Sequence, residues 1–201
     1  QKWPENLDYS DKKVVVIGSG ATAITLVPSM ATSAAHVTML QRSPTYVISR
    51  SEKDSTAKTL ERYLPDQVAY WATRWKNVLS QMILYRMSKR RPDYIRRKLI
   101  EWTQIWLGKD FDVATHFSPR YNPWDQRLCL VPNGDLFRSL RKGTSSVVTD
   151  HISRFTAEGI ELESGKVLDA DIIVSATGLE LSLLNILRCR RSSALRSLYA
   201  R

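Results

Sequence analysis

The pattern of apolar and polar positions predicts that the chain begins as an α/β unit. Residues 12–17 are a short, mainly β-branched run typical of a strand buried on both faces, and residues 36–40 form a second such run. Between them lie two glycines and then residues 21–35, which we expect to be helical, with Pro28 kinking or ending the helix. Strand, glycine turn, helix and strand together make one βαβ unit.

The pattern becomes helical in the middle of the chain, where Trp, Tyr, Arg and Lys are frequent. Two sets of apolar residues recur at helical spacing, and Pro92 suits the first turn of the second helix. We predict a helical insertion over residues 50–117, with its aromatic residues in the core rather than forming a stacking surface. The two sets are Trp71, Trp75, Val78, Leu79 and Met82, and Ile95, Leu99, Trp102 and Trp106.

Short strands return after the insertion. An irregular loop over residues 117–127 leads into a strand, a helical turn and another strand, which we place at residues 128–131, 135–140 and 146–149. A Ser-Gly turn then centres a hairpin, and residues 170–175 form the last buried strand. The chain therefore returns to the strand-rich pattern with which it began.

The turn after the first predicted strand has the sequence Gly18-Ser19-Gly20-Ala21-Thr22-Ala23, which fits G-x-G-x-x-A. The first glycine permits the tight turn, the second lets the backbone approach a pyrophosphate, and the alanine lets the helix pack on the strand. The N-terminus of the helix then directs backbone N–H groups and a partial positive charge at the phosphates. Because a strand precedes the motif and a helix follows it, we predict a dinucleotide site here.

The end of the second predicted strand indicates which dinucleotide is bound. An NAD site commonly carries an acid there for the ribose 2′-hydroxyl, but this sequence has Gln41, Arg42 and Ser43. A carboxylate would repel a 2′-phosphate, whereas the Arg42 guanidinium can pair with one through two parallel hydrogen bonds. We therefore predict NADPH as the cofactor of this site, the alternative being that Arg42 is only a surface arginine.

The predicted fold class is α/β: a Rossmann-like dinucleotide-binding domain with a parallel sheet, a β-hairpin or meander and a helical insertion. We assign residues 1–49 and 118–180 to the NADP-binding domain and residues 50–117 to the insertion. Residues 181–201 are expected to be an irregular basic tail, a truncated or out-of-frame end without function.

The net charge of +10 raises the question of a nucleic-acid partner. Half of it comes from five arginines after Glu180, where no acid occurs, and a second basic cluster over residues 89–98 is helical. Such runs are usually solvated faces, so we predict no nucleic-acid partner.

Isolated histidines and two cysteines without zinc spacing predict no metal site and a cytoplasmic location. No apolar run predicts a transmembrane segment, which leaves peripheral membrane contact open.

Four segments in this order, KKVVVIGSGATA, LQRSP, YNPWDQR and DIIVSATG, resemble the flavin-containing monooxygenases. The resemblance is closest to the Baeyer–Villiger branch, of the ethionamide-activating type, and covers most of the chain. In that family an NADPH domain is inserted into an FAD domain that has its own glycine motif, which is absent here. The resemblance therefore implies a fragment that contains mainly the NADPH-binding domain and is inactive alone.

The resemblance also implies an activity for the full-length parent. NADPH reduces the flavin, and O2 then gives a C4a-peroxyflavin that inserts one oxygen atom into a ketone or oxidises a sulfur or nitrogen centre of a small molecule. The family's catalytic arginine, which stabilises the anionic peroxide, matches Arg127. Many relatives carry a lysine before this arginine, which helps to hold the 2′-phosphate, but this chain has Gln126 there. Binding of the 2′-phosphate would therefore depend more on Arg42. The A-T-G segment adds further cofactor-binding residues, namely Ala176, Thr177 and Gly178.

Two alternatives remain open at this point. One is an N-hydroxylating or sulfide-oxidising flavin monooxygenase of the same architecture, which product analysis on the full-length parent would distinguish. The other is a basic helical nucleic-acid-binding protein, which would retain DNA in a salt-sensitive manner and would not bind NADPH. The glycine motif argues against the second alternative.

Overall fold

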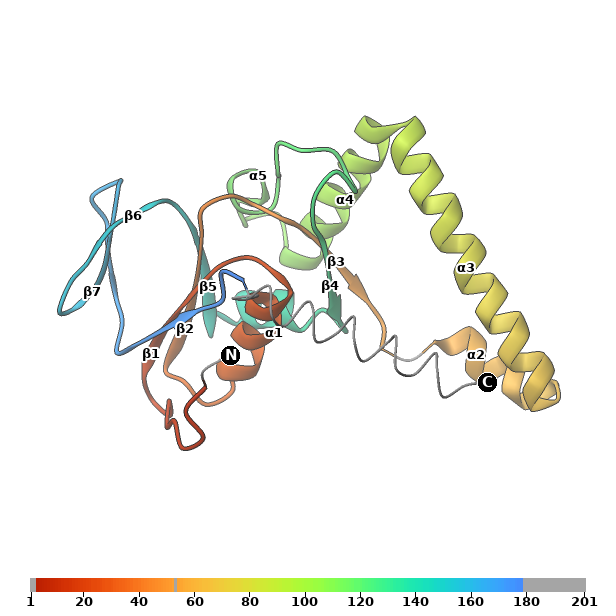
Figure 1. The fold of residues 1–201 in the computed structure, drawn as a ribbon, viewed down its shortest axis with the longest axis horizontal. Helices are drawn as coiled ribbons and strands as arrows, with labels where there is room; N and C mark the ends of the chain where they lie inside the picture. The colour runs from red at the N-terminus through yellow and green to blue at the C-terminus, as the bar shows by residue number, and fades with distance from the viewer. Residues whose placement is uncertain (1–2, 53, 179–201) are drawn as a thin grey trace, which may run out of the picture. The chain divides into compact units, whose positions relative to one another are not determined.

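A computed structural model describes residues 3–52 and 54–178 (Figure 1). The chain divides into two units, one formed by Gln1–Asp8 with Thr177–Arg201 and the other by Tyr9–Ala176. The helices and strands described below all lie in the second unit. The basic tail predicted over residues 181–201 lies outside the described residues.

A four-stranded parallel sheet forms the centre of the second unit, with the strand order β5-β2-β1-β9. β1 pairs in parallel with β2 and with β9, and β2 pairs in parallel with β5. The sequence predicted each of these strands to within two residues at either end, so the predicted parallel α/β sheet is confirmed. The strands are β1 (Lys13–Ile17), β2 (His36–Gln41), β5 (Ser145–Thr149) and β9 (Ile172–Ser175).

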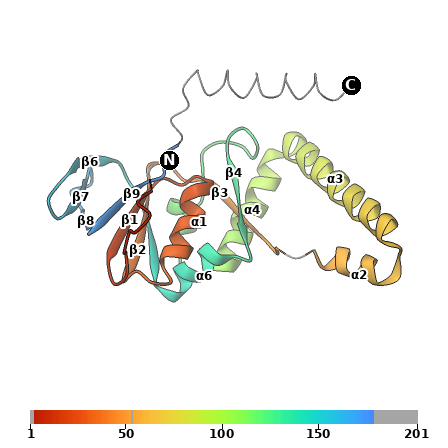
Figure 2. The same ribbon diagram turned by 60° about the horizontal axis from the view of Figure 1, so that its bottom comes forward.

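The two faces of the sheet are covered by different layers, because successive side chains of a strand point to opposite faces. Val14 and Val16 pack with α1 (Ala21–Met30) and α6 (Asp135–Lys142), whereas Val15 faces an antiparallel meander. Figure 2 shows α1 and α6 on one side and the meander on the other. The meander consists of β6 (Ile152–Phe155), β7 (Gly159–Leu162) and β8 (Val167–Asp169).

The helical segment lies between two short strands that pair in parallel, β3 (Tyr46–Arg50) and β4 (Leu128–Pro132). No strand was predicted from the sequence at β3. Helix α4 packs against β3 and α6, whereas α3 packs against α2 and α4 (Figure 1). The helices of the segment are α2 (Ser55–Tyr63), α3 (Asp66–Arg90), α4 (Pro92–Leu107) and α5 (Val113–His116).

The prediction that the aromatic residues of the insertion form its core is wrong. Trp71 and Trp75 of α3 are 53% and 56% exposed, and the buried residues of this helix are Ala69 and Ser88. Helical spacing places side chains on one face, but it does not reveal whether another element covers that face. On α4 the buried residues are Ile95, Leu99, Thr103 and Leu107, so the buried face leaves out Trp102 and Trp106.

Within residues 3–52 and 54–178, no helix is both long and apolar enough to cross a membrane.

Candidate functional site

The glycine turn joins β1 to α1 at the carboxyl end of the central sheet. Gly18 has a φ of +129°, which glycine adopts without the steric cost of a Cβ atom, and its N–H donates to the backbone of β2 at 2.8 Å. Gly20 is the N-cap of α1, where no side chain caps the helix and no acid lies in the first turn. Ala23 is fully buried against the sheet, while Ala21 and Thr22 are exposed. The start of the helix is thus open to an anion.

Ser19 connects the glycine turn to the segment that follows β2. Its hydroxyl oxygen lies 3.0 Å from Thr45 Oγ1 and donates to the backbone oxygen of Ser43 at 3.3 Å. The thiol of Cys129 donates to the backbone oxygen of Ser19 at 3.9 Å, and burial raises the pKa of this thiol. The turn and the end of β2 therefore form one connected piece of structure.

Arg127 reaches over the glycine turn from the loop before β4. A Cβ atom built on Gly20 would lie 3.3 Å from Nη1 of Arg127, so the guanidinium lies against the backbone of the turn. Gly20 has a φ of −81°, which other residues also adopt. The lack of a side chain at Gly20 therefore allows the Arg127 guanidinium to approach the backbone closely. The backbone conformation of Gly20 does not itself require a glycine.

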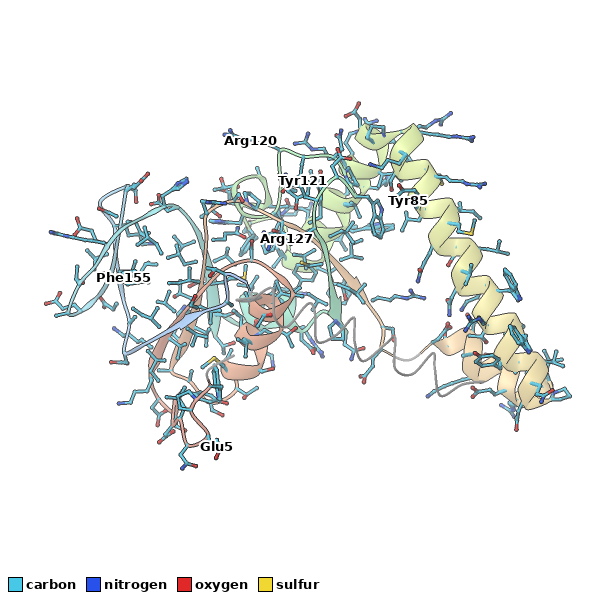
Figure 3. All side chains as sticks on the ribbon, in the orientation of Figure 1. Glu5, Tyr85, Arg120, Tyr121, Arg127 and Phe155 are labelled. Carbon is cyan, nitrogen blue, oxygen red and sulfur yellow. The ribbon has the colours of Figure 1, made fainter. Side chains whose placement is uncertain are left out.

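Two tyrosines fix the loop that carries Arg127, and Figure 3 labels Tyr121 and Arg127 on it. The hydroxyl of Tyr46 in β3 donates to the backbone oxygen of Tyr121 at 2.8 Å, and the hydroxyl of Tyr121 donates to the backbone oxygen of Arg127 at 2.9 Å. Their rings meet edge to face with centroids 5.4 Å apart. Burial raises the pKa of both phenols, which keeps them protonated as donors.

The end of α3 holds the same loop from the other side. Lys89 Nζ lies 2.6 Å from Asp125 Oδ1, and this hydrogen bond lowers the pKa of Asp125. One turn earlier on α3, the ring of Tyr85, labelled in Figure 3, meets the ring of Trp124 edge to face at 6.1 Å. The position of Arg127 therefore depends on both β3 and α3.

A pocket of about 740 Å³ lies beside the glycine turn, at the carboxyl ends of β2 and β5. Two cations line it, Arg42 from the end of β2 and Arg120 from the loop after α5. None of the described residues that line the pocket is an aspartate or a glutamate. Its remaining lining residues are Ser43, Pro44, Ala114, Thr115, Ser118, Tyr121, Gln126, Thr149 and His151.

Gln41 supports this pocket from within the protein. Its side chain is 2% exposed, and its amide donates to the backbone oxygen of His116 at 2.7 Å and to Thr149 Oγ1 at 2.8 Å. The Nδ1 atom of His116 lies 2.8 Å from the same hydroxyl. Burial lowers the pKa of His116 and so favours its neutral form. Both hydrogens of the Gln41 amide are therefore engaged with neighbouring protein groups.

The fold brings most of the predicted site residues together. Gly18, Ser19, Gly20 and Arg127 meet at the turn, and Arg42, Ser43 and Gln126 line the adjacent pocket. The backbone N–H of Ala176 donates to Ile17 at 2.8 Å beside the end of β1. Ala21, Thr22 and Ala23 form the first turn of α1, and Gln41 ends β2. Thr177 and Gly178 belong to the other unit.

Arg120 in the pocket and Thr45 beside Ser19 are among the residues of the site that were not predicted from the sequence. Both lie in segments without periodicity, so no pattern marked them. The signal available for Arg120 was a basic residue in an irregular loop near a predicted strand. In the described part of the chain, no group of three or more His, Cys, Asp or Glu side chains could hold a metal ion.

The chain is similar in sequence to FAD-containing monooxygenases. It is 58% identical over 184 residues to the FAD-containing monooxygenase EthA of Mycobacterium tuberculosis, covering 91% of this chain and 38% of that protein. It is 55% identical over 185 residues to the probable FAD-binding monooxygenase AlmA of Acinetobacter baylyi, covering 92% of this chain and 37% of that protein. The chain thus spans less than two fifths of the length of these curated relatives. No protein-family profile matches it.

Solved monooxygenase structures share the fold. An oxidised steroid monooxygenase bound to NADP superimposes with a TM-score of 0.66 at 20% identity, covering 93% of this chain and 42% of that chain. OTEMO in complex with FAD and NADP gives a TM-score of 0.64 at 19% identity, covering 92% and 41%. The Rossmann-like prediction and the predicted resemblance are confirmed, and the nucleic-acid alternative finds no support. Over about nine tenths of its length, the chain is homologous to one segment of the FAD-containing monooxygenases.

Proposed function

We propose that this chain is the NADPH-binding segment of a flavin-dependent monooxygenase. The proposal depends above all on the connection between the glycine turn and the pocket with two arginines, through Ser19 and Ser43. In Rossmann-like folds the pyrophosphate lies at the turn after the first strand, and the ribose lies near the end of the second. Here the first place is an uncapped helix start and the second is lined by cations, which suits a phosphorylated dinucleotide.

The reaction of the full-length parent follows from its relatives. We infer that the parent transfers one oxygen atom from O2 to a ketone, or to a sulfur or nitrogen centre, of a small-molecule substrate in the cytoplasm. Bound NADPH would supply a hydride to FAD, because the relatives are FAD-containing monooxygenases and the structural neighbour OTEMO was solved in complex with FAD and NADP. This chain would bind and orient the dinucleotide through residues 1–49 and 118–180, with residues 50–117 as an insertion. Alone, it would bind NADPH without consuming it.

Arg42 is the residue that we expect to select NADPH over NADH. The Gln41 amide is engaged within the protein, which leaves the guanidinium of Arg42 as the charged group at this strand end that can pair with a 2′-phosphate. Isothermal titration should show that Arg42→Ala lowers the preference for NADPH by about 1.5–3 kcal/mol, the range for a hydrogen bond to a charged group. Arg141→Ala, an exposed arginine of α6 outside the pocket, is the matched control. Equal affinity of the wild type for both nucleotides would contradict the proposal.

Arg127 is the residue that we expect to stabilise negative charge. Its guanidinium is positively charged and lies against Gly20, where a pyrophosphate would bind. Arg127→Ala should therefore weaken NADPH and NADH by similar factors, in contrast to Arg42→Ala. In the full-length parent, loss of one preorganised electrostatic contact should reduce the rate of oxygenation about 10²–10³-fold. A variant with wild-type affinities and rate would make Arg127 a structural residue of its loop.

A further inference from the structure

Arg120 is the one cation of the pocket to which the sequence analysis assigned no role. It lies on the loop between α5 and β4 and lines the same pocket as Arg42, although 78 positions separate the two in sequence (Figure 3 labels Arg120). Two arginines from distant segments therefore line one pocket at the carboxyl ends of β2 and β5. Both residues are exposed and positively charged, so an anion that enters the pocket is attracted to both.

Neither arginine is neutralised by a neighbouring acid. Among the residues that the structure describes, the ion pairs of arginine side chains are those of Arg138 and Arg154, and neither Arg42 nor Arg120 takes part in one. The lining of the pocket contains hydroxyl groups, an imidazole and an amide, but no carboxylate. The pocket thus offers donors and positive charge without internal compensation.

We propose that Arg120 is a second specificity-determining residue of the nucleotide site and binds the 2′-phosphate of NADPH together with Arg42. This inference rests on the proposed function of the same site. A phosphate monoester presents three oxygens and carries close to two negative charges at neutral pH, so two guanidinium groups can pair with it on separate edges. Gln126, which also lines the pocket, is neutral and adds no charge of its own.

The loop geometry suits this role. Ser118 Oγ donates to the backbone oxygen of Val113 at 3.1 Å on one side of Arg120, and Tyr46 holds the backbone of Tyr121 on the other. Pro119, which immediately precedes Arg120, is buried. The backbone that carries Arg120 is therefore anchored at both neighbours, which lowers the entropic cost of presenting its side chain to a ligand.

The test uses two probes that differ only in the group at issue, adenosine 2′,5′-bisphosphate and adenosine 5′-monophosphate. With the whole chain at one pH and ionic strength, Arg120→Ala should weaken the bisphosphate about tenfold or more and the monophosphate less than about twofold. Arg120→Lys should fall between, because an ammonium keeps the charge but loses the bidentate geometry. Adding Gln126→Lys to Arg120→Ala should restore part of the loss, since it returns a cation to the pocket. Arg141→Ala should change neither affinity.

The outcomes separate this inference from the proposed function. If the wild type prefers the bisphosphate and Arg42→Ala abolishes the preference while Arg120→Ala leaves it intact, the inference about Arg120 is wrong and the proposed function stands. Equal weakening of both probes by Arg120→Ala would make Arg120 a structural residue and would also overturn the inference. If the wild type binds neither probe, nor NADPH, both the inference and the proposed function fall.

Discussion

The central sheet and helix α3 are both rich in apolar residues, but only the sheet buries them. Val16 of β1 and Leu136 of α6 are fully buried in one cluster, whereas Trp71 and Trp75 of α3 are more than half exposed. In the sheet the apolar pattern is explained by contacts between described elements. On α3 it is not, because the contacts of this helix with α2, with α4 and with the loop that carries Arg127 leave Trp71 and Trp75 exposed. An apolar pattern therefore identifies a surface suited to burial without identifying what buries it.

The loop that carries Arg127 is held both by a strand and by α3. Tyr46 of β3, in the two-stranded sheet that β3 forms with β4, donates to the backbone of this loop, and Lys89 of α3 pairs with Asp125 in it. The candidate site thus belongs to the well-buried region, while one of its supports comes from the exposed helix. The following predictions test how unequal the two regions are.

The largest expected effect is a difference in the free energy of unfolding between two variants, one from each region. Leu136→Ala should lower the free energy of unfolding by about 2–5 kcal/mol, because it leaves a cavity in a packed core. Trp75→Ala should change it by less than about 0.5 kcal/mol, because an exposed side chain loses few contacts. Chemical denaturation of both variants measures the difference. If Trp75→Ala were as costly as Leu136→Ala, the exposed face of α3 would be packed in solution and the contrast would disappear.

The second prediction concerns the support of the loop from the sheet side. Tyr46→Phe removes the hydroxyl that donates to the backbone of Tyr121, and should cost about 0.5–1.5 kcal/mol of stability. Hydrogen exchange of the loop over residues 117–127 should become faster. Tyr70→Phe, which removes a hydroxyl from the exposed surface of α3, is the control and should leave the loop unchanged. Unchanged exchange in Tyr46→Phe would show that the loop does not depend on β3.

The third prediction is a pH dependence that arises from His116. Burial holds its folded-state pKa below the ordinary value of 6.5, so the unfolded chain takes up this proton first as the pH falls. The stabilisation by neutral His116 is complete above pH 6.5 and is lost as the pH falls through the folded-state pKa. His116→Gln, which can still pair with Thr149, should therefore flatten the stability profile below pH 6.5. An unchanged slope in this variant would assign the dependence to other groups.

The smallest effect is expected for the ion pair that links α3 to the loop. Asp125→Asn removes the carboxylate that Lys89 contacts, and the exposed setting of both groups means that salt should screen the interaction. Loop exchange should rise in Asp125→Asn at low salt and match the wild type at high salt. Asp110→Asn, at an exposed site beyond α4, serves as the control. A difference that persisted at high salt would indicate that the contact is not mainly electrostatic.

The amino-acid sequence by itself determined the parallel sheet and the turn at its centre. β-branched runs predicted β1, β2, β5 and β9, and the spacing of Gly18, Gly20 and Ala23 predicted the turn, because both depend on local sterics and on periods of a few residues. The first helix was predicted too long: it ends at Met30, two residues after Pro28. β3 escaped prediction, because only its first three residues are apolar and Ser49 and Arg50 follow them, so no continuous apolar run marks the strand.

Only the tertiary structure decided which distant residues share the site and which apolar faces are covered. Arg42 and Arg120 line one pocket because the fold places the end of β2 beside the loop after α5, a relation that no sequence spacing encodes. Arg127 lies against Gly20 because Tyr46, Tyr121 and Lys89 hold its loop there. The aromatic face of α3 has a helical period, yet burial requires a partner surface, and that depends on how whole elements pack rather than on any local pattern.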